Sequence, residues 1–176
     1  MENFIINTPN FASYLGFSAL LAYIITLLPT IIRIVFPITK RTNIPKILLK
    51  YRRQIGVISF LLGAAHGILL FMKRSFDVFD LKSYFIYSQG IVIMTIFALL
   101  AITSNDWSVK KLKKNWRKMH QLTYILMFLL MWHISEKMFG HWTYVTPLGI
   151  IASLAITILF LMRKWIEYKK NSLKVG

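Results

Sequence analysis

RRQIGVISFLLGAAH, at residues 52–66, is a nearly apolar run with two arginines at one end and a histidine at the other. Arg52 and Arg53 open the run, His66 closes it, and one Gln and one Ser are the polar residues between them. The pattern predicts a membrane-spanning helix that begins at a basic surface and carries an imidazole inside its apolar region. Ionisable side chains are energetically costly inside a bilayer, so His66 needs a partner or a function there.

The rest of the chain has the same apolar character. Of its 176 residues, 56% are hydrophobic, and the mean hydropathy of +0.57 is high for a water-soluble protein. Apolar stretches long enough, or nearly so, to cross about 30 Å of hydrocarbon recur along the sequence. We predict five membrane spans, at residues 14–36, 54–72, 84–103, 116–134 and 142–162. The predicted fold is all-α, an integral membrane helical bundle that forms one transmembrane domain over residues 1–176.

Basic residues predict the orientation of this bundle. Lys and Arg number seven in residues 33–53, six in residues 110–118 and five from residue 163 onward, against four in the segments on the other side. Loops rich in Lys and Arg face the cytoplasm. We therefore expect a multi-pass protein of the cell membrane with its N-terminus outside and its C-terminus in the cytoplasm. The chain has a net charge of +16, and we expect its basic loops to contact lipid headgroups and not nucleic acid.

Three histidines fall inside the predicted spans. His66 lies near the outer end of span 54–72, while His133 and His120 lie near the outer and inner ends of span 116–134. The two spans run parallel in the predicted topology, which brings His66 and His133 to a similar depth. Two neutral imidazoles at one level can take both axial positions of a haem iron. Because the chain has no cysteine, such a haem would be held without thioether links, as haem b.

A second haem level is expected nearer the cytoplasm. Arg52 precedes His66 by fourteen residues, close to four helical turns, so the two side chains share nearly one face of the helix. Arg52 then stands at the level of His120. A guanidinium stays protonated and is a poor iron ligand, so we expect Arg52 to pair with a haem propionate. The inner iron, ligated by His120, would be five-coordinate or absent, and the chain would hold one haem or two.

Other interpretations of the histidines remain open at this point. Thirteen residues of an ideal helix rotate by about 220°, so His120 and His133 would not share a face unless the helix is distorted or two haems lie on different sides of it. Buried histidines also serve as hydrogen-bonded packing residues. A zinc site is disfavoured, because no carboxylate or further histidine lies at either level.

These residues carry a resemblance to a known family. RRQIGVISFLLGAAH, with ITSNDWSVKKLKKNWRKMHQLTYILMFLLMWH at residues 102–133, resembles the ferric reductase-like transmembrane domain, most closely its MsrQ branch of haem-binding membrane subunits of bacterial methionine sulfoxide reductase systems. The resemblance covers about residues 50–162. It implies a b-type cytochrome in which His66 and His133 are the outer ligands, His120 is the inner ligand, and Arg52 takes the place where related branches carry an inner histidine.

The resemblance also implies an electron-transfer function. We expect electrons to pass across the membrane from a separate cytoplasmic flavin reductase or from quinol, with FMN or quinone as the source, because no FAD- or nicotinamide-binding domain follows the last span. The acceptor would be an extracytoplasmic reductase or a small molecule such as ferric iron or oxygen. The chain would then be an electron-transfer subunit of an oxidoreductase system, with no catalytic residue assigned. The alternatives are a stand-alone ferric or oxygen reductase haem subunit and a non-catalytic assembly subunit of a membrane complex.

Overall fold

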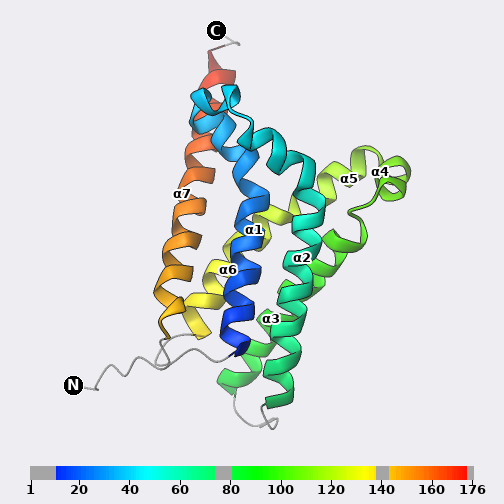
Figure 1. The fold of residues 1–176 in the computed structure, drawn as a ribbon, viewed down its shortest axis with the longest axis vertical. Coiled ribbons are helices and arrows are strands. Elements are labelled where there is room, and N and C mark those ends of the chain that lie inside the picture. The colour runs from blue at the N-terminus through cyan, green and yellow to red at the C-terminus, as the bar shows by residue number, and fades with distance from the viewer. Residues whose placement is uncertain (1–10, 74–80, 138–142, 174–176) are drawn as a thin grey trace, which may run out of the picture.

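The structure, a computed structural model, describes residues 11–73, 81–137 and 143–173. These residues form helices throughout, which confirms the predicted all-α fold (Figure 1). In chain order the elements are α1 (Phe11–Val35), the short 3-10 helix η1 (Pro37–Arg41), α2 (Ile44–Lys73), α3 (Leu81–Ile102), α4 (Asp106–Leu112), α5 (Lys114–Met119), α6 (Leu122–Lys137) and α7 (Val145–Ser172).

The five long helices pack as a closed ring. Helix α1 lies between α7 and α2, as Figure 1 shows, and packs on both. Helix α3 packs on α2 and α6, and α6 packs on α7, which closes the ring. Apolar side chains from four of these helices meet in a single core, whose members are Tyr23, Leu27, Ile31, Ile93, Phe97, Leu100, Leu126, Met127, Ile156 and Phe160.

Helix α2 contributes little to that core. Pro45 and Ser59 are the only buried residues among those of α2 whose side chains the structure describes. The other side chains of this helix are partly or fully exposed, although α2 packs on α1 and α3. Among the five long helices, the one that carries Arg52 and His66 is therefore the one whose described side chains the protein covers least.

Four of the five predicted spans each correspond to one helix, with shifted ends. Helices α1 and α3 match spans 14–36 and 84–103 closely. Helix α2 begins ten residues before span 54–72, with Pro45 in its first turn, where a missing backbone N–H is tolerated. Helix α7 extends ten residues beyond span 142–162. Hydropathy predicts only the part of a helix that lies in lipid. Helix α2 starts before that part and α7 ends after it, and both additional segments are rich in Lys and Arg.

The fourth predicted span differs most from the structure. Residues 116–134 are not one helix, because the chain breaks at His120 and Gln121, between α5 and α6. Helix α6 has 16 residues, about 24 Å, which is less than the hydrocarbon thickness of about 30 Å. In the described part of the chain, α1, α2 and α7 are long and apolar enough to cross a membrane, and α3 with α4 would form a fourth span bent by 93°.

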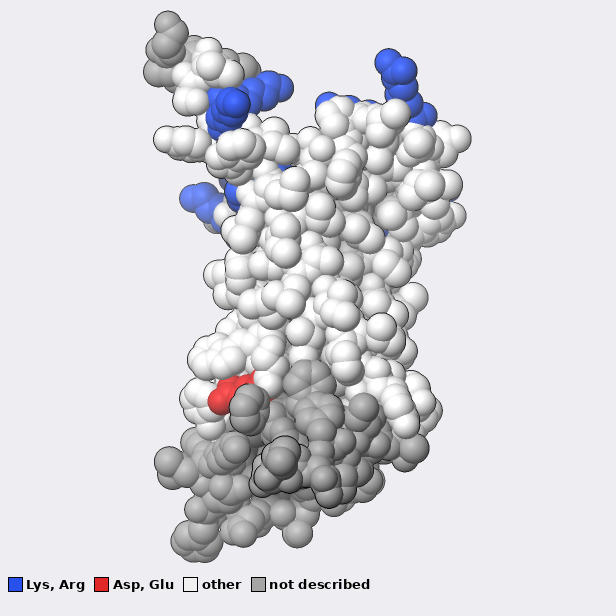
Figure 2. All heavy atoms as spheres, turned by 90° about the vertical axis from the view of Figure 1, so that its left-hand side faces the viewer, with Lys and Arg blue, Asp and Glu red and all other residues white. Residues whose placement is uncertain are grey.

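The Lys and Arg side chains that the structure describes gather at one end of the bundle. Figure 2 shows one face of the molecule, on which the described Lys and Arg side chains lie at the upper end. In Figure 1 this is the end where η1 lies and where α7 ends. Such segregation is what the positive-inside pattern requires of a membrane bundle. The orientation relative to the cell stays a prediction.

Candidate functional site

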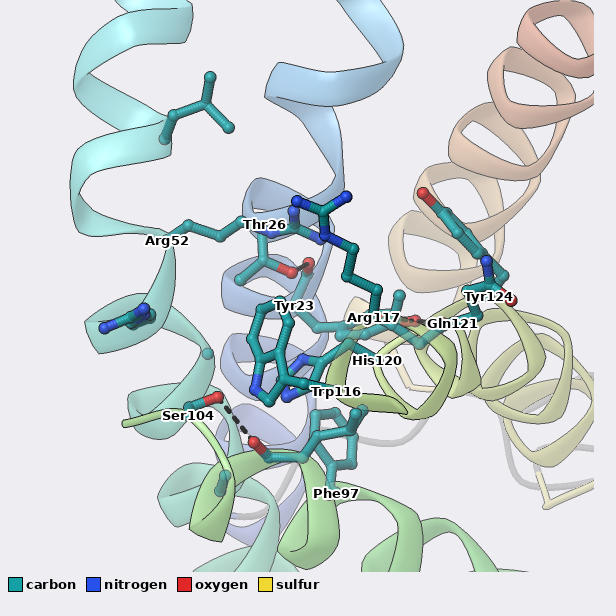
Figure 3. A pocket seen from close by; sticks show the side chains of 16 residues that line it. Tyr23, Thr26, Arg52, Phe97, Ser104, Trp116, Arg117, His120, Gln121 and Tyr124 are labelled. Carbon is teal, nitrogen blue, oxygen red and sulfur yellow. Dashed lines mark hydrogen bonds between the residues drawn. The ribbon is translucent and has the colours of Figure 1, made fainter. Parts of the chain in front are cut away.

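A cavity of about 410 Å³ lies between α1, α2, α3 and the α5–α6 break (Figure 3). Its size is in the range of small-molecule and cofactor sites. The polar and aromatic residues that line it are Tyr23, Thr26, Arg52, Arg53, Phe97, Ser104, Trp116, Arg117, His120, Gln121, Thr123 and Tyr124.

The cavity is electropositive. Arg52, Arg53 and Arg117 line it, and no Asp or Glu occurs among its described lining residues. Arg53 forms an ion pair with Asp106 at the start of α4, so Arg52 and Arg117 supply the remaining positive charge. Guanidinium groups bind carboxylates and phosphates through paired donors. The cavity is therefore suited to a ligand that carries anionic groups.

His120 is fixed by its neighbours at the break before α6. Its ring stacks on Trp116 with centroids 4.0 Å apart, and its Nε2 lies 3.2 Å from Oγ1 of Thr103. The single hydroxyl proton of Thr103 goes to the carbonyl of Leu99 at 2.6 Å, so Oγ1 accepts from Nε2–H of His120. In a neutral imidazole, the lone pair of His120 then lies on Nδ1.

His66 is held in the opposite tautomer. Its Nδ1 lies 2.6 Å from the main-chain carbonyl oxygen of Ala12 in the first turn of α1. A carbonyl oxygen can only accept, so Nδ1 donates a proton, and in a neutral imidazole Nε2 then carries the lone pair. Metal-binding histidines often have this arrangement, in which Nδ1–H donates to a carbonyl oxygen and Nε2 binds the metal.

His133 lies on α6, half-buried beside α3. Gly90 of α3 faces its ring, because a Cβ built on Gly90 would lie 4.0 Å from Cε1 of His133. One residue earlier on α3, Gln89 donates from Nε2 to the carboxylate of Glu136 at 2.6 Å. This contact joins α3 and α6 at the level of His133.

The sequence itself assigns the family. The sequence model described as "Ferric reductase like transmembrane component" matches residues 15–131, about two thirds of the chain. The chain belongs to this family. The matched residues extend from α1 into α6 and include the residues that line the cavity. Of the three predicted histidine ligands, His66 and His120 lie inside the match, and His133 follows it by two residues.

Curated relatives of this family protein are haem-binding subunits. The "Protein-methionine-sulfoxide reductase heme-binding subunit MsrQ" proteins of Brucella ovis, Brucella canis and Brucella abortus are each 32% identical to it over 120 residues. That alignment covers 65% of this chain and 51% of each relative. The chain thus spans about half the length of the curated relatives it matches. No solved structure matches it.

The structure brings some predicted site residues together. Arg52 and His120 line one cavity, although they belong to helices far apart in sequence. His66 lies against α1, and His133 lies beside α3, so the pairing of these two as outer ligands stays a prediction. The rotation of 220° between His120 and His133 does not apply, because residues 120–133 do not form one continuous helix.

Several residues around the site were not found from the sequence. Ala12, Gly16 and Ala19 form a small-residue stripe at helical spacing on α1, a signal for close helix approach in membranes. That spacing could have identified α1 as the neighbour of His66. Nothing in the local sequence marks Thr103 as a partner of His120, or Tyr23 as a lining residue of the same cavity, since both depend on how the helices pack.

Proposed function

We propose that this protein is an MsrQ-like haem-binding subunit that passes electrons across the membrane. The observation that carries the proposal is the hydrogen bond from Nδ1 of His66 to the carbonyl of Ala12, because in a neutral imidazole it leaves the lone pair on Nε2, the atom that would ligate iron. The family of the chain and the haem-binding role that its curated relatives are named for support the same assignment.

The residues present fit haem at two levels. At the outer level, His66 and His133 would be the axial ligands. At the inner level, His120 would be the ligand and Arg52 would pair with a propionate, since both line the electropositive cavity. Haem bound there would accept and donate one electron at a time. The chain has no cysteine, so its own side chains can form no thioether link to haem, which agrees with a non-covalently held haem b.

The protein's own groups set the environment of each level. The carbonyl of Ala12 fixes the tautomer of His66, and the hydroxyl of Thr103 orients His120. Iron ligation at His120 would use Nδ1 in this arrangement, or Nε2 after release of Thr103. The two levels therefore differ in ligand geometry as well as in charge, which would give two centres of different reduction potential.

The basic end of the bundle supports one orientation for the proposed electron path. If this end faces the cytoplasm, as the distribution of Lys and Arg favours (Figure 2), the inner cavity lies on the cytoplasmic side. A cytoplasmic flavoprotein or a membrane quinol would then reduce the inner level. An extracytoplasmic protein partner, or a small acceptor such as ferric iron or oxygen, would take electrons from the outer level.

Spectra of the full chain purified from haem-replete cells test this function. We expect a reduced-minus-oxidised difference spectrum and a pyridine haemochromogen of the b type. His66→Ala and His133→Ala should each remove the same spectral component, because a bis-imidazole centre that loses one ligand leaves the other unsupported. Ser135→Ala, an exposed residue on the same helix as His133, should leave the spectrum unchanged.

A packing role for the histidines is the competing assignment. His120 already has a stacking partner and a hydrogen bond to Thr103, which a structural residue would also show. A non-catalytic assembly subunit would be colourless after purification, and that result would refute the proposed function. Loss of different spectral components from His66→Ala and His133→Ala would show that these two residues do not share one iron.

A further inference from the structure

The contact between His66 and α1 involves more than one hydrogen bond. Gly16 lies one turn beyond Ala12 on α1, and so on the same face. A Cβ at Gly16 would lie 2.9 Å from Nδ1 and 2.9 Å from Cε1 of His66, and 3.3 Å from Cγ. The imidazole thus rests against the main chain of α1, at a distance that only glycine permits without movement.

The ring of His66 cannot easily move aside. It is joined to α2 by one methylene group, so it is not the far end of a flexible side chain. Its Nδ1 is also tied to the carbonyl of Ala12 at 2.6 Å. A methyl group at Gly16 would turn the ring, lengthen this bond, or push α1 and α2 apart.

A second hydrogen bond joins α1 and α2 two turns away from His66. Ser59 donates its hydroxyl to the carbonyl of Ala19 at 2.8 Å and is fully buried. Ser59 precedes His66 by seven residues, and Ala19 follows Ala12 by seven, so both contacts belong to one antiparallel register. This second contact resists separation of the helices, and a methyl group at Gly16 would act mainly on the ring.

We infer that α1 is the positioning element for His66. The carbonyl of Ala12 sets the tautomer that leaves the lone pair on Nε2, and the missing side chain of Gly16 sets the orientation of the ring. Gly16 is therefore a positioning residue for the outer ligand, although it lies 50 residues from His66 in sequence. This inference rests on the proposed function, because it assigns the role of a residue toward haem.

Gly16→Ala in the full chain tests the inference, with Gly67→Ala as the matched control. Gly67 adjoins His66 on α2, and a Cβ there would meet nothing within 4 Å. Both variants replace a helical glycine with the same residue. Mutation of a group that orients a metal-binding histidine typically lowers metal affinity by about ten- to a hundredfold. We expect Gly16→Ala to weaken haem binding to this extent. Haem retained in Gly16→Ala should show shifted low-spin EPR g values, and Gly67→Ala should match the wild type.

A second measurement does not depend on haem. Thermal unfolding of the haem-free protein is compared for Gly16→Ala in the wild-type background and in the His66→Ala background. Because the methyl group would collide with the imidazole, it should lower the unfolding midpoint only where His66 is present. Equal effects in both backgrounds would overturn the contact and the inference with it.

The outcomes separate this inference from the proposed function. A wild-type protein that binds no haem would refute the function, while the haem-free comparison would still report on the contact. A wild-type protein that binds haem, with Gly16→Ala indistinguishable from it in affinity and EPR spectrum, would overturn the positioning role and leave the function intact. Matching losses in Gly16→Ala and Gly67→Ala would also overturn it, since the effect would then be a general property of glycine replacement.

Discussion

Tyr23 in the middle of α1 donates its hydroxyl to the main-chain carbonyl of Thr123, a hundred positions away in the first turn of α6. Both residues are buried, with Tyr23 only 3% exposed. The N–H of Thr123 in turn bonds to the carbonyl of His120 at 3.4 Å. The chain therefore reaches the start of α6 in a position fixed relative to α1, and His120 is placed at the wall of the cavity as a result.

Tyr23→Phe should destabilise the protein. The substitution keeps the ring, which packs edge-on to Phe97, and removes the hydroxyl that satisfies the carbonyl of Thr123. Loss of such a buried hydrogen bond typically costs about 1 kcal/mol. Circular dichroism during heating in detergent measures the change in the unfolding midpoint. Tyr168→Phe, at a residue that is 74% exposed, should have no effect, and an equal effect at both sites would contradict this prediction.

Arg52→Ala should disturb the inner level alone. If Arg52 pairs with a propionate, its removal leaves a carboxylate unpaired near the membrane edge, which is unfavourable. We expect weaker retention of the inner haem or a shifted inner potential, with the outer centre unchanged. Arg52→Lys should restore the inner centre in part, because lysine keeps the charge but lacks the paired donors of a guanidinium.

Haem stoichiometry with a redox titration measures these effects. Arg53→Ala is the matched control, since Arg53 lines the same cavity but is already paired with Asp106. A single haem per chain that neither Arg52→Ala nor His120→Ala affects would remove the inner site. The protein would then be a cytochrome with one haem.

The sequence allowed the helices to be predicted well and their ends less well. Apolar runs located α1 and α3 within a few residues, because lipid selects for hydropathy over the length of a span. The same signal missed the first ten residues of α2 and the last ten of α7, since basic segments can continue a helix in water. The break at His120 and Gln121 carries no Pro or Gly, so no local breaker marked it.

The candidate site was predictable only in part. The spacing of fourteen residues placed Arg52 and His66 on one face of α2, and Ser59, midway between them, is buried against α1 as that face requires. The neighbours of these residues on other helices depend on packing register, which hydropathy does not contain. Gly16 and Tyr23 became visible as neighbours only once α1 was placed against α2 and α6.

Asp106→Asn should change the pH dependence of stability. A hydrogen bond from Arg53 and the charge of its guanidinium hold the pKa of the Asp106 carboxyl below its ordinary value of about 3.9. A lowered pKa in the folded state means that the ion pair stabilises the protein above the ordinary value, and that this contribution is lost as the pH falls through the lowered pKa. The pair is exposed, so its contribution should be small and weaker in high salt.

Unfolding midpoints of wild type and Asp106→Asn between pH 7 and pH 3 measure this contribution. The two midpoints should differ by a constant amount from pH 7 to pH 5 and converge below about pH 4. Arg53→Gln removes the same pair from the other side and should show the same convergence. A difference that persists unchanged at pH 3 would show that the effect of Asp106 does not depend on its charge, and so does not come from the ion pair with Arg53.

Lys113→Gly should stabilise the turn that carries α5. Lys113 joins α4 to α5 at φ 45° and ψ −115°, and it is the one residue other than glycine with a positive φ in the described part of the chain. Side chains avoid this region, at a cost of about 1 to 3 kcal/mol, whereas glycine adopts it readily. We expect the unfolding midpoint of Lys113→Gly to exceed that of Lys113→Ala, which loses the same charge but keeps a Cβ. Equal midpoints for the two variants would show that relief of repulsion among the neighbouring lysines, and not the backbone, explains any gain.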